Sequence, residues 1–138
     1  MQSLDKKGNG MFQRKILIID DEDVICKACE MVLSEQEFSC DHCLSGVEGL
    51  ERALGQPYDM LLLDMKLKDM DGMEILRRVK KEKPDLYVIV ITGYSTIANT
   101  VKAMKLGAND YLSKPFADHE LIKAVKDLFN QEQLDQDQ

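Results

Sequence analysis

Residues 16–23 read ILIIDDED, an aliphatic run that ends abruptly in four acids. Two more runs have the same apolar character, MLLL at residues 60–63 and VIVI at residues 88–91. Continuous apolar runs of this length are typical of central parallel strands, which are buried on both faces. The three segments therefore predict the middle strands of a parallel sheet.

Two weaker segments complete the predicted sheet, an alternating edge strand at residues 38–43 and a second edge at residues 110–113. Five segments with helical periodicity separate and follow the strands. The second of these helices is predicted to run from about Val47 to Leu54 and to stop before Gly55 and Pro57. The predicted apolar stripes of the other four are Ile25, Ala28, Cys29 and Val32; Ile75, Leu76 and Val79; Ile97, Val101 and Met104; and Leu121, Ile122, Val125 and Leu128.

Residues at the helix ends support this division of the chain. The first helix is predicted to end near Glu35, and Pro84 closes the third. Ser95 and Asp118 are the predicted N-caps of the fourth and fifth helices, and Gly107 the predicted C-terminal cap of the fourth.

The order is strand then helix, repeated five times. Right-handed crossovers then place helices on both faces of a single five-stranded parallel sheet. The predicted fold class is α/β, doubly wound and flavodoxin-like, with strand order 2-1-3-4-5. We expect this domain to span residues 14–130, with a mobile N-terminal tail at 1–13 and a C-terminal tail or linker stub at 131–138.

Length and composition limit the functional classes. A chain of 138 residues suits one domain, and no apolar run is long enough to span a membrane. The polar start lacks the apolar core of a secretory signal. A net charge of −7 argues against a broad nucleic-acid surface. We therefore expect a soluble, cytoplasmic protein that itself binds neither nucleic acid nor membrane.

Two cysteine pairs repeat the spacing of a zinc ribbon, Cys26 with Cys29 and Cys40 with Cys43, and His42 lies inside the second. Neither pair has the Gly or Pro that usually accompanies a zinc knuckle. In the strand-like second pair, a spacing of three also puts the thiols on opposite faces. We favour reduced thiols that act as small apolar residues over a structural zinc site.

Polar residues follow four of the predicted strands. Asp20 and Asp21 follow the first, Asp64 the third, Thr92 the fourth and Lys114 the fifth. In open α/β sheets, ligands bind outside the carboxyl ends of the strands, at the point where strand order reverses. Here that point lies between the first and third strands, so these side chains are expected to share one rim.

The chemistry of this rim suggests a cation and a phosphoryl group. Two carboxylates about 4 Å apart repel by roughly 4 kcal/mol at an effective dielectric near 20, and Mg²⁺, which prefers oxygen ligands, offsets such repulsion. Asp64 could then attack a phosphoryl group, with Lys114 and Thr92 stabilising its oxygens. Taken singly, the acids could merely complement a helix N-terminus, Lys114 could be a solvated lysine and Thr92 a turn residue.

Over residues 14–130 the sequence resembles a known family, the receiver domains of response regulators in two-component signalling. The resemblance is carried by ILIIDDE at 16–22, LD at 63–64, MDG at 70–72, ITG at 91–93 and GANDYLSKPF at 107–116. It implies a phosphorylation-dependent switch, not an enzyme. Asp64 would accept a phosphoryl group from a phosphohistidine of a sensor histidine kinase or from a phosphotransfer protein.

The resemblance also implies a ligand set for Mg²⁺, for which Mn²⁺ can substitute. Asp21 and Asp64 would bind the ion directly, and Asp20 mainly through water. The backbone carbonyl of Lys66 would be a further ligand. Lys114 would contact the phosphoryl oxygens.

A cis bond before Pro115 and a pair of switch residues, Thr92 and Tyr111, complete the roles that the resemblance implies. The alternative for Tyr111 is an ordinary edge-strand aromatic. Phosphorylation would bias the surface of the fourth helix, fifth strand and fifth helix, which would contact an output domain, a partner protein or a second copy in a homodimer. This surface, otherwise a solvated face, includes Lys102, Lys105, His119 and Lys123.

Within the family, residues 100–116 are most similar to receivers of sigma-54-type transcription activators. One departure is Lys68, where many relatives have Pro four residues after the phosphorylated Asp. We expect it to make the acceptor loop more mobile and to alter the lifetime of the phosphoryl group. Lys66 and Tyr94 occupy positions that often tune self-hydrolysis.

Three other functions compete with this interpretation. Asp21-x-Asp23-Val24 imitates the nucleophile motif of haloacid-dehalogenase-like phosphatases, but the cap and late acidic pair of those enzymes are not found. A flavin-binding module would share the fold, but four acids replace the phosphate-binding loop that it needs. A receiver that signals without phosphorylation is also conceivable, although the complete acidic set gives no reason to prefer it.

Overall fold

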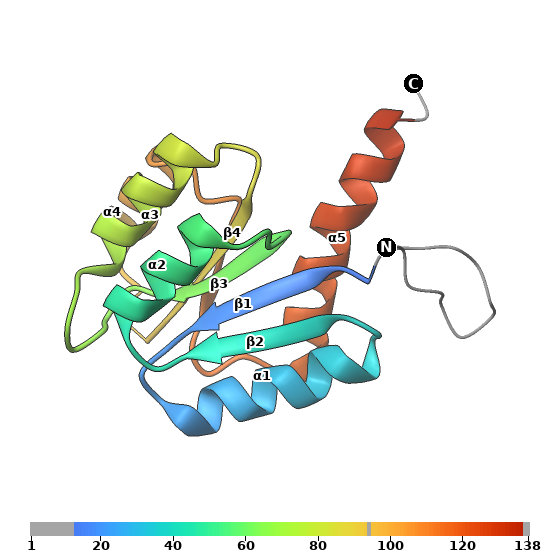
Figure 1. Ribbon diagram of the computed structural model, residues 1–138, viewed down its shortest axis with the longest axis horizontal. Helices are drawn as coiled ribbons and strands as arrows, with labels where there is room; N and C mark the ends of the chain where they lie inside the picture. Colours follow the sequence, from blue (N-terminus) through green and yellow to red (C-terminus); the bar gives the residue numbers. More distant parts are fainter. Residues whose placement is uncertain (1–12, 94, 137–138) are drawn as a thin grey trace.

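The computed structural model describes residues 13–93 and 95–136, with the backbone alone for 132–136. Strands and helices alternate as predicted (Figure 1). The strands are β1 (Lys15–Ile19), β2 (Ser39–Cys43), β3 (Met60–Asp64), β4 (Tyr87–Thr92) and β5 (Asp110–Ser113). The helices are α1 (Asp23–Glu35), α2 (Gly46–Gly55), α3 (Gly72–Glu82), α4 (Ile97–Lys105) and α5 (Asp118–Gln136).

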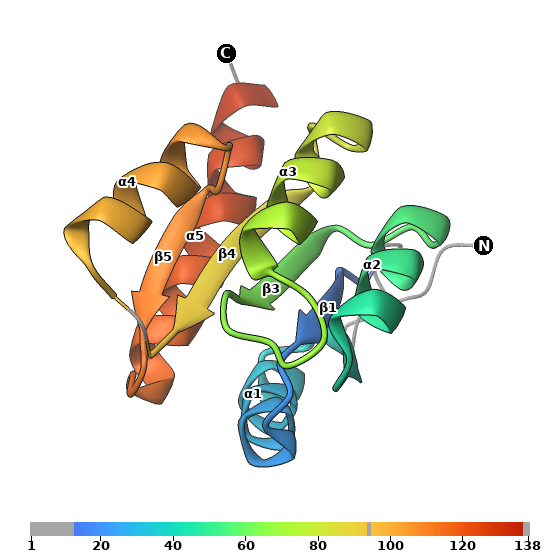
Figure 2. The same ribbon diagram turned by 90° about the vertical axis from the view of Figure 1, so that its left-hand side faces the viewer.

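The five strands form one parallel sheet in the order β2-β1-β3-β4-β5, which confirms the predicted topology. Helices α1 and α5 cover one face, and α2, α3 and α4 lie on the other (Figures 1 and 2). Because both faces are covered, the central strands are buried from their second residue onward, and β3 along its whole length, which explains their continuous apolar sequences.

Two apolar layers flank the sheet, and alternate residues of each strand enter opposite layers. Leu17 and Ile19 of β1 pack in the layer beneath α2 and α3. Ile16 and Ile18 pack in the layer beneath α1 and α5. Alternate residues of the strands therefore supply both apolar layers, and each layer packs against the helices on its own face of the sheet.

The cysteines are part of these layers, as expected of thiols that act as small apolar residues. Cys26 and Cys29 of α1 are buried in the α1/α5 layer, against which Cys40 also packs, while Cys43 lies in the opposite layer. Burial raises the pKa of the Cys26 thiol to about 12 and that of Cys29 to about 11. Both thiols are therefore protonated at neutral pH and act as small apolar side chains.

Two helices bury different residues from those predicted. In α1 the buried side chains are Cys26, Cys29 and Leu33, whereas Ala28 of the predicted stripe is exposed. In α4 only Ala103 is buried, and all three residues of the predicted stripe are exposed: Ile97, Val101 and Met104. Periodicity identifies an apolar face, but it does not show whether the sheet or another surface covers that face.

Two predicted helix N-caps are corrected by one residue each. Thr96, not Ser95, caps α4, because its side chain accepts a hydrogen bond from Asn99 N. Asp118 lies inside α5, whose first turn begins from the carbonyl of Ala117. Gly107 follows α4 with φ of 106°, a left-handed conformation that favours glycine and confirms the predicted stop.

The expected C-terminal tail is helical where the structure describes it, because α5 continues through residues 131–136. These residues are mainly Gln, Glu and Leu, which are good helix formers despite their low apolar content. Residues 1–12 of the predicted N-terminal tail and residues 137–138 lie outside the described part, so both domain boundaries stay predictions. No helix of the described residues has the length and apolar composition needed to cross a membrane.

Candidate functional site

The predicted acids come together at the carboxyl ends of β1 and β3, on the side of the molecule that Figure 2 faces. Asp20 directly follows β1, and Asp64 is the last residue of β3. One carboxylate oxygen from each of Asp20, Asp21 and Asp64 lies within 4.8 Å of the others. Asp20 is fully buried and Asp64 is 4% exposed, so both carboxylates are largely shielded from solvent.

Lys114 lies among these carboxylates. Its Nζ is 2.7 Å from Asp20 Oδ2 and 3.3 Å from both Asp64 Oδ2 and Glu22 Oε2. Burial by itself lowers the pKa of Lys114, but the hydrogen bond and charge of Asp20 and the charge of Asp64 outweigh it and raise that pKa. The ammonium group is therefore charged at neutral pH. Glu22 was not among the predicted site residues, although it is the third acid of the opening run.

The pKa of the Asp20 carboxyl group is set by its burial and by its neighbours. Burial raises its pKa, while Lys114 and the N–H of Glu22, which donates to Asp20 Oδ1 at 2.9 Å, oppose the rise. A single ammonium faces three clustered carboxylates, so negative charge remains in excess. The donors are all oxygens, which suits a hard divalent cation such as Mg²⁺. The residues present therefore fit the ion that the resemblance implied.

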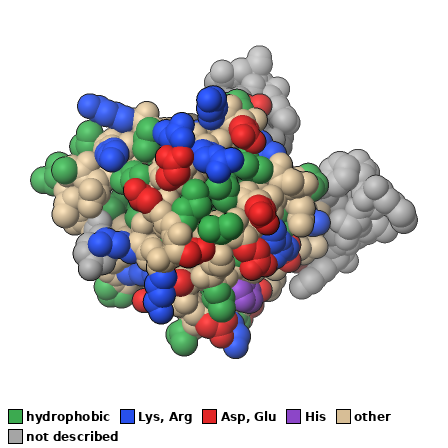
Figure 3. Space-filling view, turned by 60° about the vertical axis from the view of Figure 1, so that its left-hand side comes forward, with side chains coloured by type: hydrophobic (Ala, Val, Ile, Leu, Met, Phe, Trp, Pro, Cys, Tyr) green, Lys and Arg blue, Asp and Glu red, His purple; other side chains and the backbone are tan. Residues whose placement is uncertain are grey.

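The excess charge arises locally. On the side of the molecule in Figure 3, acidic and basic side chains are interspersed over the surface. The concentration of negative charge therefore comes from the convergence of β1 and β3, where parallel strands end at a common edge.

Asp64 is held by contacts to both of its carboxylate oxygens. Oδ1 accepts a hydrogen bond from Lys66 N at 3.1 Å, and Oδ2 faces Lys114. A solvent-open cavity of about 430 Å³ adjoins it, lined in part by Asp21, Lys66 and Lys68. A nucleophilic carboxylate, a positive charge and space for a further group are thus present together. The role of the Lys66 carbonyl as a ligand stays a prediction.

The remaining predicted residues lie on the neighbouring strands. Thr92 ends β4 and is fully buried, and its carbonyl accepts from Lys114 N at 2.9 Å. Tyr111 of β5 is half-buried and packs against the α2/α3 layer, with Val90 as its partner in register. The bond between Lys114 and Pro115 is cis, as the resemblance implied. A switching role for Thr92 and Tyr111 stays a prediction.

The loop from β3 to α3 carries a contact that sequence reasoning missed. The Asp69 carboxylate accepts hydrogen bonds from the backbone N–H groups of Gly46 and Val47 and from the Ser45 hydroxyl. These groups lie at the N-terminus of α2, so the loop that leaves Asp64 is attached to that helix. The backbone N–H of Gly46, the Ser45 hydroxyl and the N–H of Val47 lower the pKa of Asp69 to about 2. No local sequence signal links segments so far apart.

The lowered pKa of Asp69 predicts a specific pH dependence of the free energy of unfolding. Its folded-state pKa of about 2 lies below the ordinary 3.8, so its contribution is complete above roughly pH 4 and is lost as the pH falls through the folded value. Urea unfolding of wild type and Asp69→Ala should therefore give a stability difference that is constant at neutral pH and shrinks toward pH 2. A difference that persists unchanged at pH 2 would show that the carboxylate is not the stabilising species.

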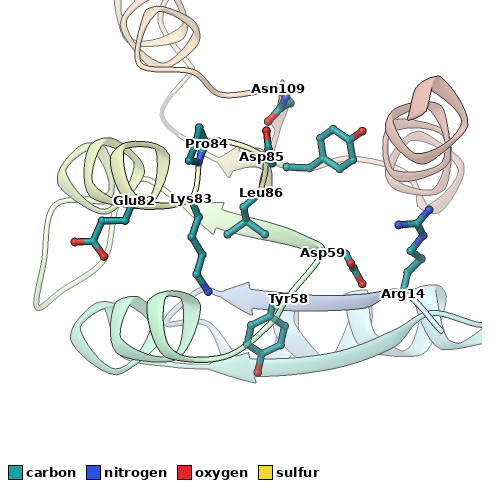
Figure 4. Close-up of a pocket in the computed structure, with 10 residues that line it drawn as sticks. Arg14, Tyr58, Asp59, Glu82, Lys83, Pro84, Asp85, Leu86 and Asn109 are labelled. Atoms are coloured by element: carbon teal, nitrogen blue, oxygen red, sulfur yellow. The ribbon is translucent and has the colours of Figure 1, made fainter. Parts of the chain in front are cut away.

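A larger cavity, of about 780 Å³, opens at the opposite edge, where the strands begin (Figure 4). Its polar groups include side chains that already bind neighbouring loops. Lys83 Nζ donates to the carbonyls of Ala53 and Gln56, and Asp59 accepts from Lys15 N. The cavity therefore has size but lacks the convergent acids found at the carboxyl edge, which is the better candidate site.

The chain is similar to known proteins over most of its length. The family model described as "Response regulator receiver domain" matches residues 16–126. The probable transcriptional regulatory protein SilR of Salmonella typhimurium is 37% identical over 114 residues, which cover 83% of this chain and 50% of SilR. The chain spans about half the length of the curated relatives it matches.

Two solved structures show the same fold at low sequence identity. A CheY-like receiver domain protein from Methanospirillum hungatei has a TM-score of 0.85 at 28% identity, covering 89% of this chain and 98% of that one. The BeF3-activated receiver domain of DrrB, from Thermotoga maritima, has a TM-score of 0.80 at 30% identity, covering 86% and 99%. The relation to sigma-54-type activators stays a prediction.

Proposed function

The chain belongs to the receiver domains of response regulators, regulatory domains of two-component signalling, and on this premise we propose that it is a switch operated by phosphorylation of Asp64. The observation that carries the proposal is the setting of the Asp64 carboxylate. It is almost fully buried, borders an open cavity, faces Lys114 and lies beside two further carboxylates.

In the proposed transfer, an Asp64 carboxylate oxygen forms a bond to phosphorus while the phosphorus–nitrogen bond of a phosphohistidine breaks. The electron pair of that bond returns to the imidazole ring of the sensor kinase or phosphotransfer protein. Such a transfer depends on positioning and on neutralising the phosphoryl oxygens. Lys114 supplies a positive charge, and the Thr92 hydroxyl supplies a hydrogen bond.

Mg²⁺ is the proposed resident cation, with Mn²⁺ as a substitute. Asp21 and Asp64 would hold it directly, Asp20 mainly through water, and the carbonyl of Lys66 as a further ligand. The bound ion would neutralise the carboxylates of the rim and the charge of the incoming phosphoryl group. The oxygen-only donor set, in which Asp20 and Asp64 are buried and Asp21 is half-buried, and its excess negative charge support this assignment.

Magnesium binding should raise the stability of the folded protein. A ligand that binds only the folded state at ten times its dissociation constant stabilises it by about 1.4 kcal/mol. Thermal unfolding of wild type should therefore shift upward on adding Mg²⁺, and the shift should be much smaller in Asp21→Asn. An equal shift in both proteins would place the ion elsewhere.

The proposed output is a change in the surface formed by α4, β5 and α5. The phosphoryl group would favour the conformer in which the Thr92 hydroxyl reaches it and Tyr111 moves inward. On α4, exposed Ile97, at 87%, and exposed Val101 leave apolar area available to an output domain, a partner protein or a second copy. BeF3 activation of the DrrB receiver domain supports a switch of this kind in the same fold.

The proposal is tested by intact mass after incubation with acetyl phosphate and Mg²⁺. The wild-type chain should gain one phosphoryl group, and a chelator should prevent the gain. Absence of a gain in folded protein with Mg²⁺ present would instead support a phosphorylation-independent binding module. The phosphatase alternative has no support at the site, because Asp23 is not one of the three clustered carboxylates and pairs instead with Lys27 of α1 at 2.8 Å.

A further inference from the structure

A backbone hydrogen bond joins the two loops that border the candidate site. Lys68 N, in the loop from β3 to α3, donates to Asp21 Oδ2 at 3.1 Å. Figure 2 shows this loop extending from the end of β3 toward the end of β1. Asp21 is half-buried, and the side chain of Lys68 is exposed. The contact therefore depends on the main chain of residue 68 and not on its side chain.

The donor belongs to a segment that is held at other points. An isolated antiparallel bridge links Lys66 to Asp71, and Asp69 binds the N-terminus of α2. These contacts fix the position of the Lys68 N–H relative to β3, so it is a pre-positioned donor. The greater loop mobility that we expected from Lys68 stays a prediction.

We propose that the backbone N–H of Lys68 is a positioning group for the cation site, holding Asp21 at the rim before the ion arrives. The inference rests on the proposed function, in which Asp21 is a magnesium ligand. A carboxylate has about four acceptor positions, so the bond to Oδ2 leaves the other oxygen and further lone pairs for a cation. Asp21 then loses less side-chain freedom on binding than an untethered carboxylate would.

The same hydrogen bond couples the ion to the acceptor loop. Because Lys66 N also donates to Asp64, two backbone N–H groups of one short segment contact two carboxylates of the site. Movement of that segment would disturb Asp21 and Asp64 together. The structure thus assigns residues 66–68 a role that does not depend on their side-chain charges.

The test compares Mg²⁺ affinity in wild type, Lys68→Ala and Lys68→Pro by titration calorimetry. Alanine removes the charge but keeps the N–H, whereas proline removes both. The φ of Lys68 is not positive, so its sign does not exclude proline. Lys68→Ala should bind within about 2-fold of wild type, and Lys68→Pro about 5-fold more weakly, equivalent to about 1 kcal/mol. Equal weakening in both variants, or tighter binding in Lys68→Pro, would overturn the inference.

A second measurement tests the hydrogen bond without any ion. Amide hydrogen exchange at residue 68 is followed in metal-free wild type and Asp21→Ala, with the Lys66 amide, which donates to Asp64, as an internal control. Exchange at residue 68 should accelerate several-fold in the variant, while residue 66 changes little. Unchanged exchange at residue 68 would show that Lys68 N does not donate to Asp21, and would overturn the inference. Failure of wild type to bind Mg²⁺ would instead overturn the proposed cation site. The exchange result would still show whether Lys68 N is bonded to Asp21.

Discussion

Asp64→Asn should abolish phosphorylation, so that its intact mass stays unchanged under conditions in which wild type gains one phosphoryl group. A neutral carboxamide is a poor nucleophile toward phosphorus. Of the two neighbouring carboxylates, Asp20 is fully buried against Lys114, and Asp21 accepts a hydrogen bond from Lys68 N. The variant should still fold, since it removes one charge from a cluster of like charges. Loss of labelling should therefore report chemistry and not unfolding.

The matched control is Asp59→Asn, which changes a carboxyl group immediately before β3, at the opposite edge of the sheet. Asp59 accepts a hydrogen bond from Lys15 N, and a carboxamide oxygen can accept the same bond. This variant should be labelled as fully as wild type. Equal labelling of wild type and Asp64→Asn would move the phosphoacceptor to another residue, and peptide mapping of the modified chain would identify it.

Gly72→Ala should cause the largest loss of stability among single-methyl substitutions near the site. A Cβ at position 72 would lie 2.5 Å from Met65 Cα and 2.6 Å from the carbonyl oxygen of Asp64. Both are backbone atoms, so no flexible side chain can move aside. We expect a loss of about 2–3 kcal/mol, measured by urea unfolding, because an overpacked site must shift its backbone.

Gly55→Ala is the control for Gly72→Ala. Gly55 is the last residue of α2, and a Cβ there meets nothing within 4 Å. The substitution should leave stability unchanged or raise it by about 0.5 kcal/mol, through the lower entropy of the unfolded chain. If Gly72→Ala were as stable as Gly55→Ala, the backbone near Asp64 would be more adaptable than the close approach implies.

Much of the fold and site follows from short stretches of sequence. The apolar runs at 16–19, 60–63 and 88–91 predict buried parallel strands, because only strands covered on both faces need continuous apolar residues. Once those strands are parallel, their carboxyl ends share an edge, and the positions of Asp20, Asp64 and Lys114 follow from where each strand stops. The strand order and the clustering of the acids were predictable for this reason.

Helix burial required the tertiary structure. The stripe of Ile97, Val101 and Met104 predicted the buried face of α4, yet these side chains are exposed and Ala103 is buried instead. Periodicity measures how apolar residues are distributed around a helix, but the rotation of a helix on the sheet depends on all the side chains beneath it. The periodicity of a helix therefore does not predict whether its apolar face is buried or exposed.

By itself, the sequence determined the strands, their order and the acids at the rim, because each depends on residues that are adjacent in the chain or on the rules of parallel sheets. Only the tertiary structure decided how the rim is held. The bond from Lys68 N to Asp21, the attachment of Asp69 to α2 and the contact of Glu22 with Lys114 join segments that are distant in sequence. Such contacts depend on loop conformation, which composition and periodicity do not specify.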